Sequence, residues 1–360
     1  MWVGFPGTST QLMRRTLLIL PVALLTASVS LRADALLFGL FESYLESLRK
    51  QAGIPGLAAA LVGENGILWE RGFGLQDIDR SIATRPDTPF HLDGLAQVFT
   101  SALALRCVEE GRLDLDDRVA SFDRGSAEAN ATVRQLLTHT SMGPGGLVFS
   151  YSPPRLAPLS TVVPECIDDD SFRETVANTL DRFAMRDSVP GPDAVSLPDL
   201  FDPRTVDRYR GVLARLATPY AVDKKGRPTR SSYEATGLTA SSGLISTARD
   251  LAEFDLALRK TVLVTGDTLA AAWRNPISAT GLPLPHGIGW FVQGHNGELV
   301  VWQFGVAEGK SSSLMIKIPG RGLTLILLAN SDGLAVPLPL AAVDVNASPM
   351  GRLFLRLFVS

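Results

Sequence analysis

The chain has 360 residues, of which 46% are hydrophobic and 20% are charged, and its formal net charge is −3. This length and composition suffice for a large buried core, arranged as one large domain or as two subdomains. The slightly acidic balance and the lack of a long Lys/Arg run argue against a nucleic-acid partner. The four histidines are scattered along the sequence, and no His/Cys/Asp cluster has metal-ligand spacing, so we expect no metal and no other cofactor.

The N-terminus has the features of a secretory signal peptide, in the usual order. Arg14 and Arg15 precede an apolar run at residues 17–29, and small residues follow up to Ala35. The run is short for a transmembrane span. We therefore predict a signal peptide at residues 1–35 and a periplasmic or secreted protein without a stable membrane span after cleavage. An uncleaved segment would instead leave the protein anchored to the membrane.

Apolar periodicity predicts a first helix over residues 36–51, which ends before Gly53 and Pro55. The residues expected on its buried face are Leu37, Leu40, Phe41, Tyr44, Leu45 and Leu48. Two apolar runs then flank Asn65-Gly66, and Asn-Gly between such runs is the strongest short hairpin signal. Two antiparallel strands are therefore predicted near residues 57–73.

A buried helix within residues 90–111 is the centre of the predicted fold. Its apolar residues have the spacing of one buried helix face, with Asp93 as the expected N-cap and Gly111 as the expected C-cap glycine. Cys107 lies on this helix and is interpreted as a small buried residue. Whether it pairs with Cys166 does not follow from the sequence.

Further along the chain, residues 172–185 are expected to form a helix. Thr247 and Asp250 resemble a capping box at the start of another helix. Several β-rich runs then follow within residues 287–330, broken by Gly, Asn and Pro, and they are typical of an antiparallel sheet.

The segments PDTPFHL before the central helix and EEGRLDLDDRV after it, together with LLTHTS, resemble the serine β-lactamase and penicillin-binding-protein superfamily, especially its class C-like and esterase branch. The resemblance implies an α/β (α+β) fold: an antiparallel sheet flanked by helices, plus a helical subdomain. We place the β-lactamase-like domain at residues 36–360, with residues 36–85 and 236–360 in an α/β subdomain and residues 86–235 in a mainly helical one. Residues 142–235 match the family poorly. Strands near 57–73 and 287–330 are expected to pair.

The family's S-x-x-K motif, which supplies the nucleophilic serine and its lysine, aligns with Gly94 and Gln97. A serine hydroxyl is a weak nucleophile until a neighbouring base accepts its proton, and an amide is not a base near neutral pH. The acyl-enzyme route is therefore closed at this position. Losing such a nucleophile costs on the order of a million-fold in turnover. The backbone N–H of Gly94 remains as half of an oxyanion site.

Two further motifs keep their frames but lose their most reactive residues. The family's Y-x-N motif aligns with Tyr151 and with Pro153, which has no side-chain donor. The K-T-G or H-x-G motif aligns with Gln303 and Gly305, so that a cation is replaced by an amide. His139, within LLTHTS, corresponds to a segment that is structural in the family, and we interpret it as structural.

These substitutions favour an exported pseudoenzyme that binds a cell-wall peptide or a similar small acyl-amide ligand in the old cleft, without hydrolysis. No catalytic residue is assigned; the ligand-binding candidates are Gly94, Gln97, Tyr151, Gln303 and Gly305. The alternative is a serine-hydrolase-family enzyme of β-lactamase, D-peptidase or esterase type with residual activity or a displaced nucleophile, for which the candidates are Thr100, Ser101, Ser141 and Ser152. A third hypothesis is a degenerate protein with structural or partner-binding value alone. The ligand and the oligomeric state do not follow from the sequence.

Overall fold

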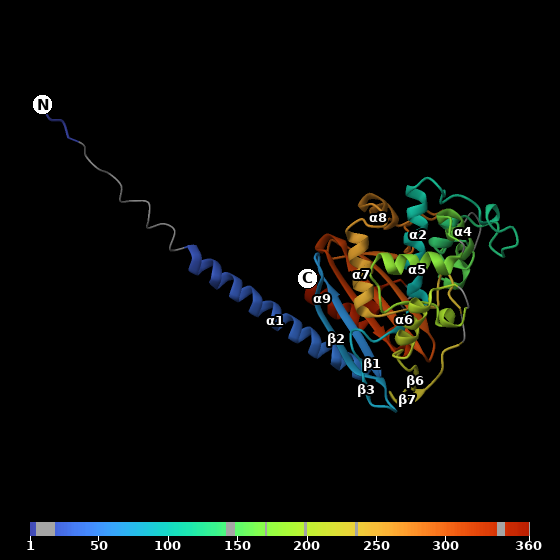
Figure 1. The fold of residues 1–360 in the computed structure, drawn as a ribbon, viewed down its shortest axis with the longest axis horizontal. Helices are drawn as coiled ribbons and strands as arrows, with labels where there is room; N and C mark the ends of the chain where they lie inside the picture. Colours follow the sequence, from blue (N-terminus) through green and yellow to red (C-terminus); the bar gives the residue numbers. More distant parts are fainter. Residues whose placement is uncertain are drawn as a thin grey trace.

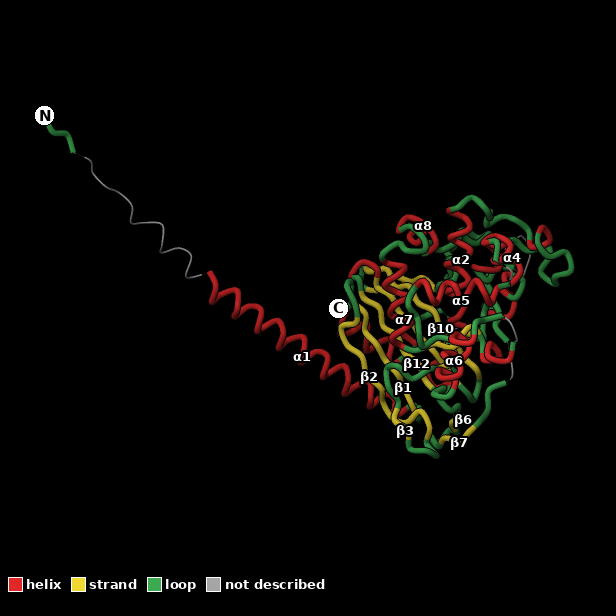
Figure 2. Tube along the Cα trace, viewed as in Figure 1, coloured by secondary structure: helices red, strands yellow, loops and turns green. Residues whose placement is uncertain are grey.

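A seven-stranded antiparallel sheet forms the centre of the computed structural model, with strand order β3-β2-β1-β12-β11-β10-β9 (Figures 1 and 2). The structure describes residues 1–4, 19–141, 148–169, 171–197, 200–234, 237–336 and 343–359, and for residues 19–34 it describes the backbone. The strands of the sheet are β1 (Gly56–Val62), β2 (Ile67–Asp77), β3 (Ile82–Ala83), β9 (Phe291–His295), β10 (Glu298–Ala307), β11 (Ser311–Ile318) and β12 (Leu323–Ala329).

The sheet is assembled from both ends of the chain, as predicted. β1 pairs with β2 through a hairpin, in which Gly63 N–H donates to the Gly66 carbonyl at 2.8 Å. On its other side β1 pairs with β12, from Leu57 opposite Ala329 to Val62 opposite Thr324. The Asn65-Gly66 hairpin and the long-range strand pairing are both confirmed.

Helices cover the two faces of the sheet, and the alternation of β1 shows which helices lie on which face. Leu57, Ala59 and Leu61 pack in one cluster with residues of α1 (Ile19–Gln51) and α9 (Pro349–Phe358). Ala58, Ala60 and Val62 pack in a second cluster with residues of α2 (Gln97–Glu109) and α7 (Ala248–Arg259). Each cluster therefore belongs to one face of the sheet.

A mainly helical region lies beyond α2, on the side of the sheet away from α1 (Figure 1). Its helices are α3 (Val133–Leu137), α4 (Leu159–Ile167), α5 (Phe172–Arg182) and α6 (Pro203–Leu213), and α8 (Gly266–Ala272) follows α7. Two small sheets complete the fold: β4 (Phe90–His91), β8 (Leu244–Ser246) and β5 (Val189–Pro190) form one, and β6 (Tyr220–Val222) and β7 (Pro228–Arg230) form the other. The helix predicted at 172–185 is α5, three residues shorter at its end.

The first helix is confirmed over residues 36–51, but its buried face is narrower than predicted. Phe41 and Leu45 are fully buried, whereas Leu40 and Tyr44 are 46% and 53% exposed. The sheet and α9 contact α1 along one stripe, and Leu40 and Tyr44 lie beside this stripe, about 100° around the helix from its centre.

The N-terminal predictions fall partly outside the described residues. Arg14 and Arg15 lie there, and α1 as described starts at Ile19 and continues through Ala35. Within the described part of the chain, no helix combines the length and apolar character that crossing a membrane requires. Signal-peptide cleavage near Ala35 and the subdomain boundaries remain predictions.

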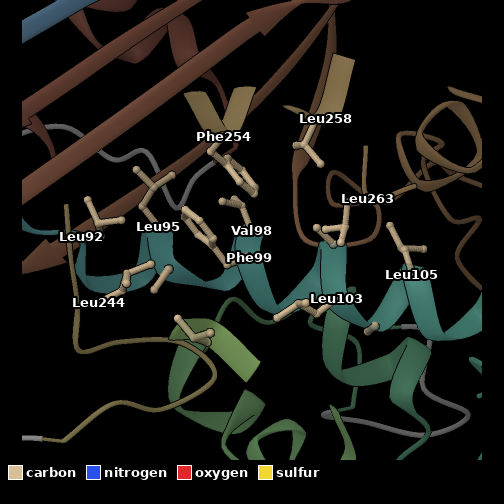
Figure 3. Close-up of a cluster of buried hydrophobic side chains, with 14 of the residues drawn as sticks. Leu92, Leu95, Val98, Phe99, Leu103, Leu105, Leu244, Phe254, Leu258 and Leu263 are labelled. Carbon is tan, nitrogen blue, oxygen red and sulfur yellow. The ribbon is translucent and has the colours of Figure 1, made fainter. Parts of the chain in front are cut away.

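The central helix consists of a 3₁₀ turn, η1 (Asp93–Ala96), followed directly by α2. The sequence predicted one buried face, but every residue from Leu95 to Leu105 is buried. Figure 3 shows why: side chains such as Val98 and Phe99 point toward Phe254 of α7, while others point toward the helical region. The helix thus lies between two layers rather than on a surface.

Asp93 does not cap this helix, so the N-cap prediction is wrong. Its backbone has a φ of +50°, and its side chain accepts a hydrogen bond from Ser311 Oγ of β11 at 2.7 Å. The side chain therefore contacts a strand instead of the first helical N–H groups. Gly111 follows the C-cap Glu110 with a φ of +68°, which confirms the predicted C-terminal glycine.

A disulfide bond joins Cys107 of α2 to Cys166 of α4, with their Cα atoms 6.1 Å apart.

At the start of α7, which the sequence predicted as a helix start, the Thr247 side chain accepts a hydrogen bond from Asp250 N–H, which confirms the cap. The Asp250 carboxylate bonds to the Ser188 hydroxyl instead of returning to Thr247, so the capping box is only half formed.

Candidate functional site

A cleft of about 580 Å³ opens where η1, the end of β10 and the loop before η4 (Pro153–Leu156) meet. Three of the five predicted ligand-binding residues, Gly94, Tyr151 and Gly305, are among its lining residues. The other two, Gln97 and Gln303, are fully buried, and both are hydrogen-bonded to the Tyr151 hydroxyl. The fold therefore brings together all five positions, which come from three distant segments of the chain.

Gly305 is required for this arrangement. A Cβ atom at that position would lie 2.0 Å from the Leu92 carbonyl oxygen and 2.8 Å from the Gly94 nitrogen, so any side chain would force β10 away from η1. Gly94 is different. A Cβ atom there would meet the Phe304 carbonyl oxygen at 3.2 Å and the Tyr151 hydroxyl at 3.5 Å, which a small local shift accommodates. The missing side chain at position 94 is therefore not imposed by the backbone.

Gln97 is held by three hydrogen bonds. Its Nε2 group donates to the Gly94 carbonyl at 2.8 Å and to the Tyr151 hydroxyl oxygen at 3.0 Å. Its Oε1 atom lies 2.9 Å from His139 Nε2. Both N–H groups of the amide are thus used within the protein.

Gln303 is held in the same way on the neighbouring strand. Its Nε2 group lies 3.1 Å from the Gly289 carbonyl and 3.0 Å from His286 Nε2. Its Oε1 atom accepts from the Tyr151 hydroxyl at 3.1 Å and from the Phe304 N–H at 2.9 Å. The Tyr151 hydroxyl therefore joins the two amides into one network.

The backbone contacts of the two histidines assign their tautomers. Ser152 N–H donates to His139 Nδ1 at 3.3 Å, so the proton of His139 is on Nε2 and is donated to Gln97. His286 Nδ1 lies 2.8 Å from the Gly287 carbonyl, so its proton is on Nδ1 and its Nε2 accepts from Gln303. Every donor of the network finds an acceptor.

The network is neutral near pH 7. Burial lowers the pKa of His139 to about 3, against an opposing hydrogen bond from the Ser152 backbone. Burial also lowers the pKa of His286 far below its ordinary value, and the neighbouring His139 acts in the same direction. Burial raises the pKa of Tyr151, partly opposed by the hydrogen bond from Gln97. None of the three side chains is ionised, and the network contains no lysine and no activated hydroxyl at position 94.

The sequence interpretation treated His139 as structural and did not single out His286. Their ring centroids are 4.7 Å apart, although the four histidines look scattered along the chain. For His139 a signal existed, because LLTHTS places a polar side chain at the end of an apolar helix. No sequence signal pointed to His286, which the loop before β9 carries to the network.

Among the residues that the structure describes, no group of His, Cys, Asp or Glu is arranged to hold a metal ion.

The proposed displaced nucleophiles are not placed in the cleft. Thr100 Oγ1 donates to the Ala240 carbonyl at 2.6 Å and Ser101 Oγ donates to the Gln97 carbonyl at 2.8 Å; both side chains are buried. Ser141 and Ser152 are absent from the cleft lining. Ser241 and Ser242 do line the cleft. The Ser242 hydroxyl is hydrogen-bonded to the Thr239 hydroxyl at 2.9 Å, which is not a base that could activate it.

Asp93 supplies the charge in this cleft. It is half-buried in the cleft wall, where burial raises its pKa to about 6 although the Ser311 hydrogen bond and nearby Lys310 oppose the rise. Lys310 itself forms an ion pair with Glu234 at 2.6 Å.

Solved structures with a similar fold include a penicillin-binding protein homologue and a D-alanine carboxypeptidase. The octameric penicillin-binding protein homologue from Pyrococcus abyssi is 20% identical, with a TM-score of 0.70 over 89% of this chain and 77% of that chain. D-alanine carboxypeptidase AmpC from Burkholderia cenocepacia is 18% identical, with a TM-score of 0.66 over 88% of this chain and 98% of that chain. At these identities the likeness shows the fold alone.

Curated relatives match a shorter part of the chain, and the family match covers most of it. Protein flp of Staphylococcus aureus (strain NCTC 8325 / PS 47) is 26% identical over 117 residues, which are 31% of this chain and 24% of flp. Penicillin-binding protein 4 of Amycolatopsis lactamdurans is 34% identical over 107 residues, 28% of each protein. The matches thus span about a quarter of the relatives' length. The sequence model of the Beta-lactamase family matches residues 41–165 and 169–346, and the chain therefore belongs to the beta-lactamase family.

Proposed function

We propose that this chain is a non-hydrolytic member of its family that binds a small acyl-amide compound, such as a cell-wall peptide, reversibly in the cleft. One observation carries the proposal: the groups beneath the cleft form a closed, neutral hydrogen-bond network around Gln97 and Gln303. An amide whose two N–H groups are already bonded neither accepts a proton from a hydroxyl nor stabilises a developing anion. The glycine at position 94 removes the nucleophile itself.

The surroundings support binding without chemistry. The cleft has a volume of about 580 Å³, and Thr239, Ser241 and Ser242 contribute hydroxyl-bearing side chains to its polar rim. The Cys107–Cys166 disulfide supports placement outside the cytoplasm, since disulfides persist mainly in oxidising compartments. A periplasmic or secreted location is part of the proposal.

Whole-protein mass spectrometry after incubation with a fluorophosphonate and with a β-lactam tests this function. We expect no covalent adduct on the natural protein, and an adduct on a Gly94→Ser/Gln97→Lys double variant, because position 94 has room for a small side chain. A Gly94→Ala/Gln97→Lys variant, which has the same lysine but no hydroxyl, serves as the matched control and should stay unlabelled.

An adduct on the natural protein would overturn the proposal. The modified peptide would then identify a displaced nucleophile, for example Ser241 or Ser242 at the rim, and would establish the hydrolase alternative. Binding is measured separately by calorimetry with an N-acetylated dipeptide amide, which carries no charge and whose reversible association with the unmodified protein is expected.

A further inference from the structure

The described lining of the cleft carries negative charge and no positive charge. Its described lining residues are apolar or hydroxylic except for Asp93, and they include no Lys, Arg or His. A ligand in this cleft therefore meets one carboxylate and no cation of the lining.

The carboxylate of Asp93 is held in place from one side. Its Oδ2 atom accepts from Ser311 Oγ at 2.7 Å, and within the described part of the chain no hydrogen bond to Oδ1 is found. The nearby ammonium group of Lys310 is bonded to Glu234 at 2.6 Å and is not part of the lining. Oδ1 is consequently the oxygen of this lining residue that is left with acceptor capacity for a ligand.

Aromatic rings stand beside this carboxylate. Tyr151 and Phe304 both line the cleft, and their rings are stacked with centroids 5.2 Å apart. The hydroxyl of Tyr151 is engaged with the two glutamines, so the ring remains as its contact surface for a ligand. Aromatic faces attract cations, and their attraction adds to that of a carboxylate when both are partly shielded from water.

We infer that Asp93 makes the cleft selective for ligands that carry a protonated amine on an apolar body, and selective against ligands that carry a carboxylate. The inference rests on the proposed function, because it concerns what the cleft binds once acylation is lost. A protonated amine donates to Oδ1, its apolar body contacts Phe304 and Tyr151, and any amide groups reach the hydroxyls of the rim. An anionic ligand of the same shape is repelled by Asp93 and finds no compensating cation in the lining.

Three probes with the same phenylethyl body test the selectivity: phenethylamine as the cation, 2-phenylethanol as the neutral compound and 3-phenylpropanoate as the anion. Their dissociation constants are measured by protein-observed NMR titration at pH 7.5, where Asp93 is ionised. We expect the amine to bind about tenfold more tightly than the alcohol, and the anion to bind most weakly.

Asp93→Asn keeps the shape of the side chain and its bond to Ser311 while removing the charge. Asn also tolerates the positive φ of this position, and Asp93→Gly provides a second variant that is free of that constraint. In both variants the amine should lose about tenfold in affinity, the alcohol should be unchanged and the anion should gain. Asp116→Asn, which removes an exposed carboxylate outside the cleft, is the matched control and should change none of the three.

Equal affinities for the three probes, a preference for the anion, no measurable binding of the amine, or unchanged selectivity in both Asp93 variants would each overturn this inference. None of these results involves acylation, so the proposed non-hydrolytic function would stand. Conversely, covalent labelling of the natural protein would overturn the proposed function whatever the probes show.

Discussion

Two polar clusters are buried on the same face of the sheet. One contains a buried ion pair, whereas all side chains of the other are neutral. On β10 and β11, Gln303 is opposite Met315, and the next pair on that face is Val301 opposite Lys317. Lys317 is 3% exposed and forms an ion pair with the fully buried Asp255 of α7. Gln303, two residues along β10 from the partner of Lys317, belongs to a network without any charge.

The difference shows what each cluster needs in order to remain buried. Burial lowers the pKa of Lys317, but the Asp255 carboxylate opposes this effect and Thr324 adds a hydrogen bond to the same carboxylate. Among the described residues, no hydrogen-bond partner of Gln97 or Gln303 is a carboxylate, so a cation there would be buried without a partner. The cluster beneath the cleft is stable because all of its members are neutral together.

The largest expected effect comes from breaking the charged cluster. Asp255→Leu leaves Lys317 buried without its carboxylate, and we expect it to lower the free energy of unfolding by about 3–5 kcal/mol. An Asp255→Leu/Lys317→Met double variant should recover part of this loss, because it removes the buried cation but leaves Arg259 and Thr324 without the carboxylate that both contact. Urea denaturation of the three proteins measures both effects, and a double variant as unstable as the single one would contradict the ion-pair account.

Acid should destabilise the neutral cluster. His139 has a folded-state pKa of about 3, below its unfolded value near 6.5, so its contribution to stability is complete above pH 6.5 and is lost as the pH falls toward 3. Between pH 6 and pH 4 this amounts to about 2–3 kcal/mol. His139→Gln keeps a donor for Gln97 but does not titrate. Denaturation curves at pH 6, 5 and 4 should therefore show a smaller loss for His139→Gln, and parallel profiles would refute the neutral assignment.

Opening the neutral cluster at one amide should have the smallest effect. Gln97→Leu leaves His139 Nε2 without its acceptor in a buried position, and we expect a loss of about 1–3 kcal/mol. Gln51→Leu is the control, since that side chain is exposed and donates a hydrogen bond to the exposed Ser47 hydroxyl. Thermal unfolding followed by circular dichroism compares the two variants. Equal midpoints would mean that the network contributes nothing to stability.

Local signals explain how much of the fold was predictable. The Asn65-Gly66 turn, the glycine that ends the central helix at Gly111 and the cap at Thr247 each depend on a few neighbouring residues, and all three are found as expected. The frames around Gly94, Tyr151 and Gln303 predicted a common site because the resemblance supplied their arrangement, and these residues do converge.

The remaining features depend on contacts between distant segments. The contact between Asp93 and Ser311 replaces a cap that local spacing favoured, since η1 packs against β10 and β11 instead of starting freely in solvent. His286 reaches the network through the loop before β9, and the pairing of Cys107 with Cys166 depends on the packing of α2 against α4. None of these neighbours is visible in the spacing of residues along the chain.

The pairing of β1 with β12 has a consequence for how the protein is made. Leu57 lies near the beginning of the chain and its partner Ala329 near the end, so synthesis from the N-terminus completes β1 long before β12 exists. In the interval the β1–β2 hairpin has an apolar strand with an open edge, the feature by which nascent chains associate wrongly. Closure of the sheet must therefore be a late event, and any helper protein that shields this chain during its biogenesis has to cover the open edge of β1.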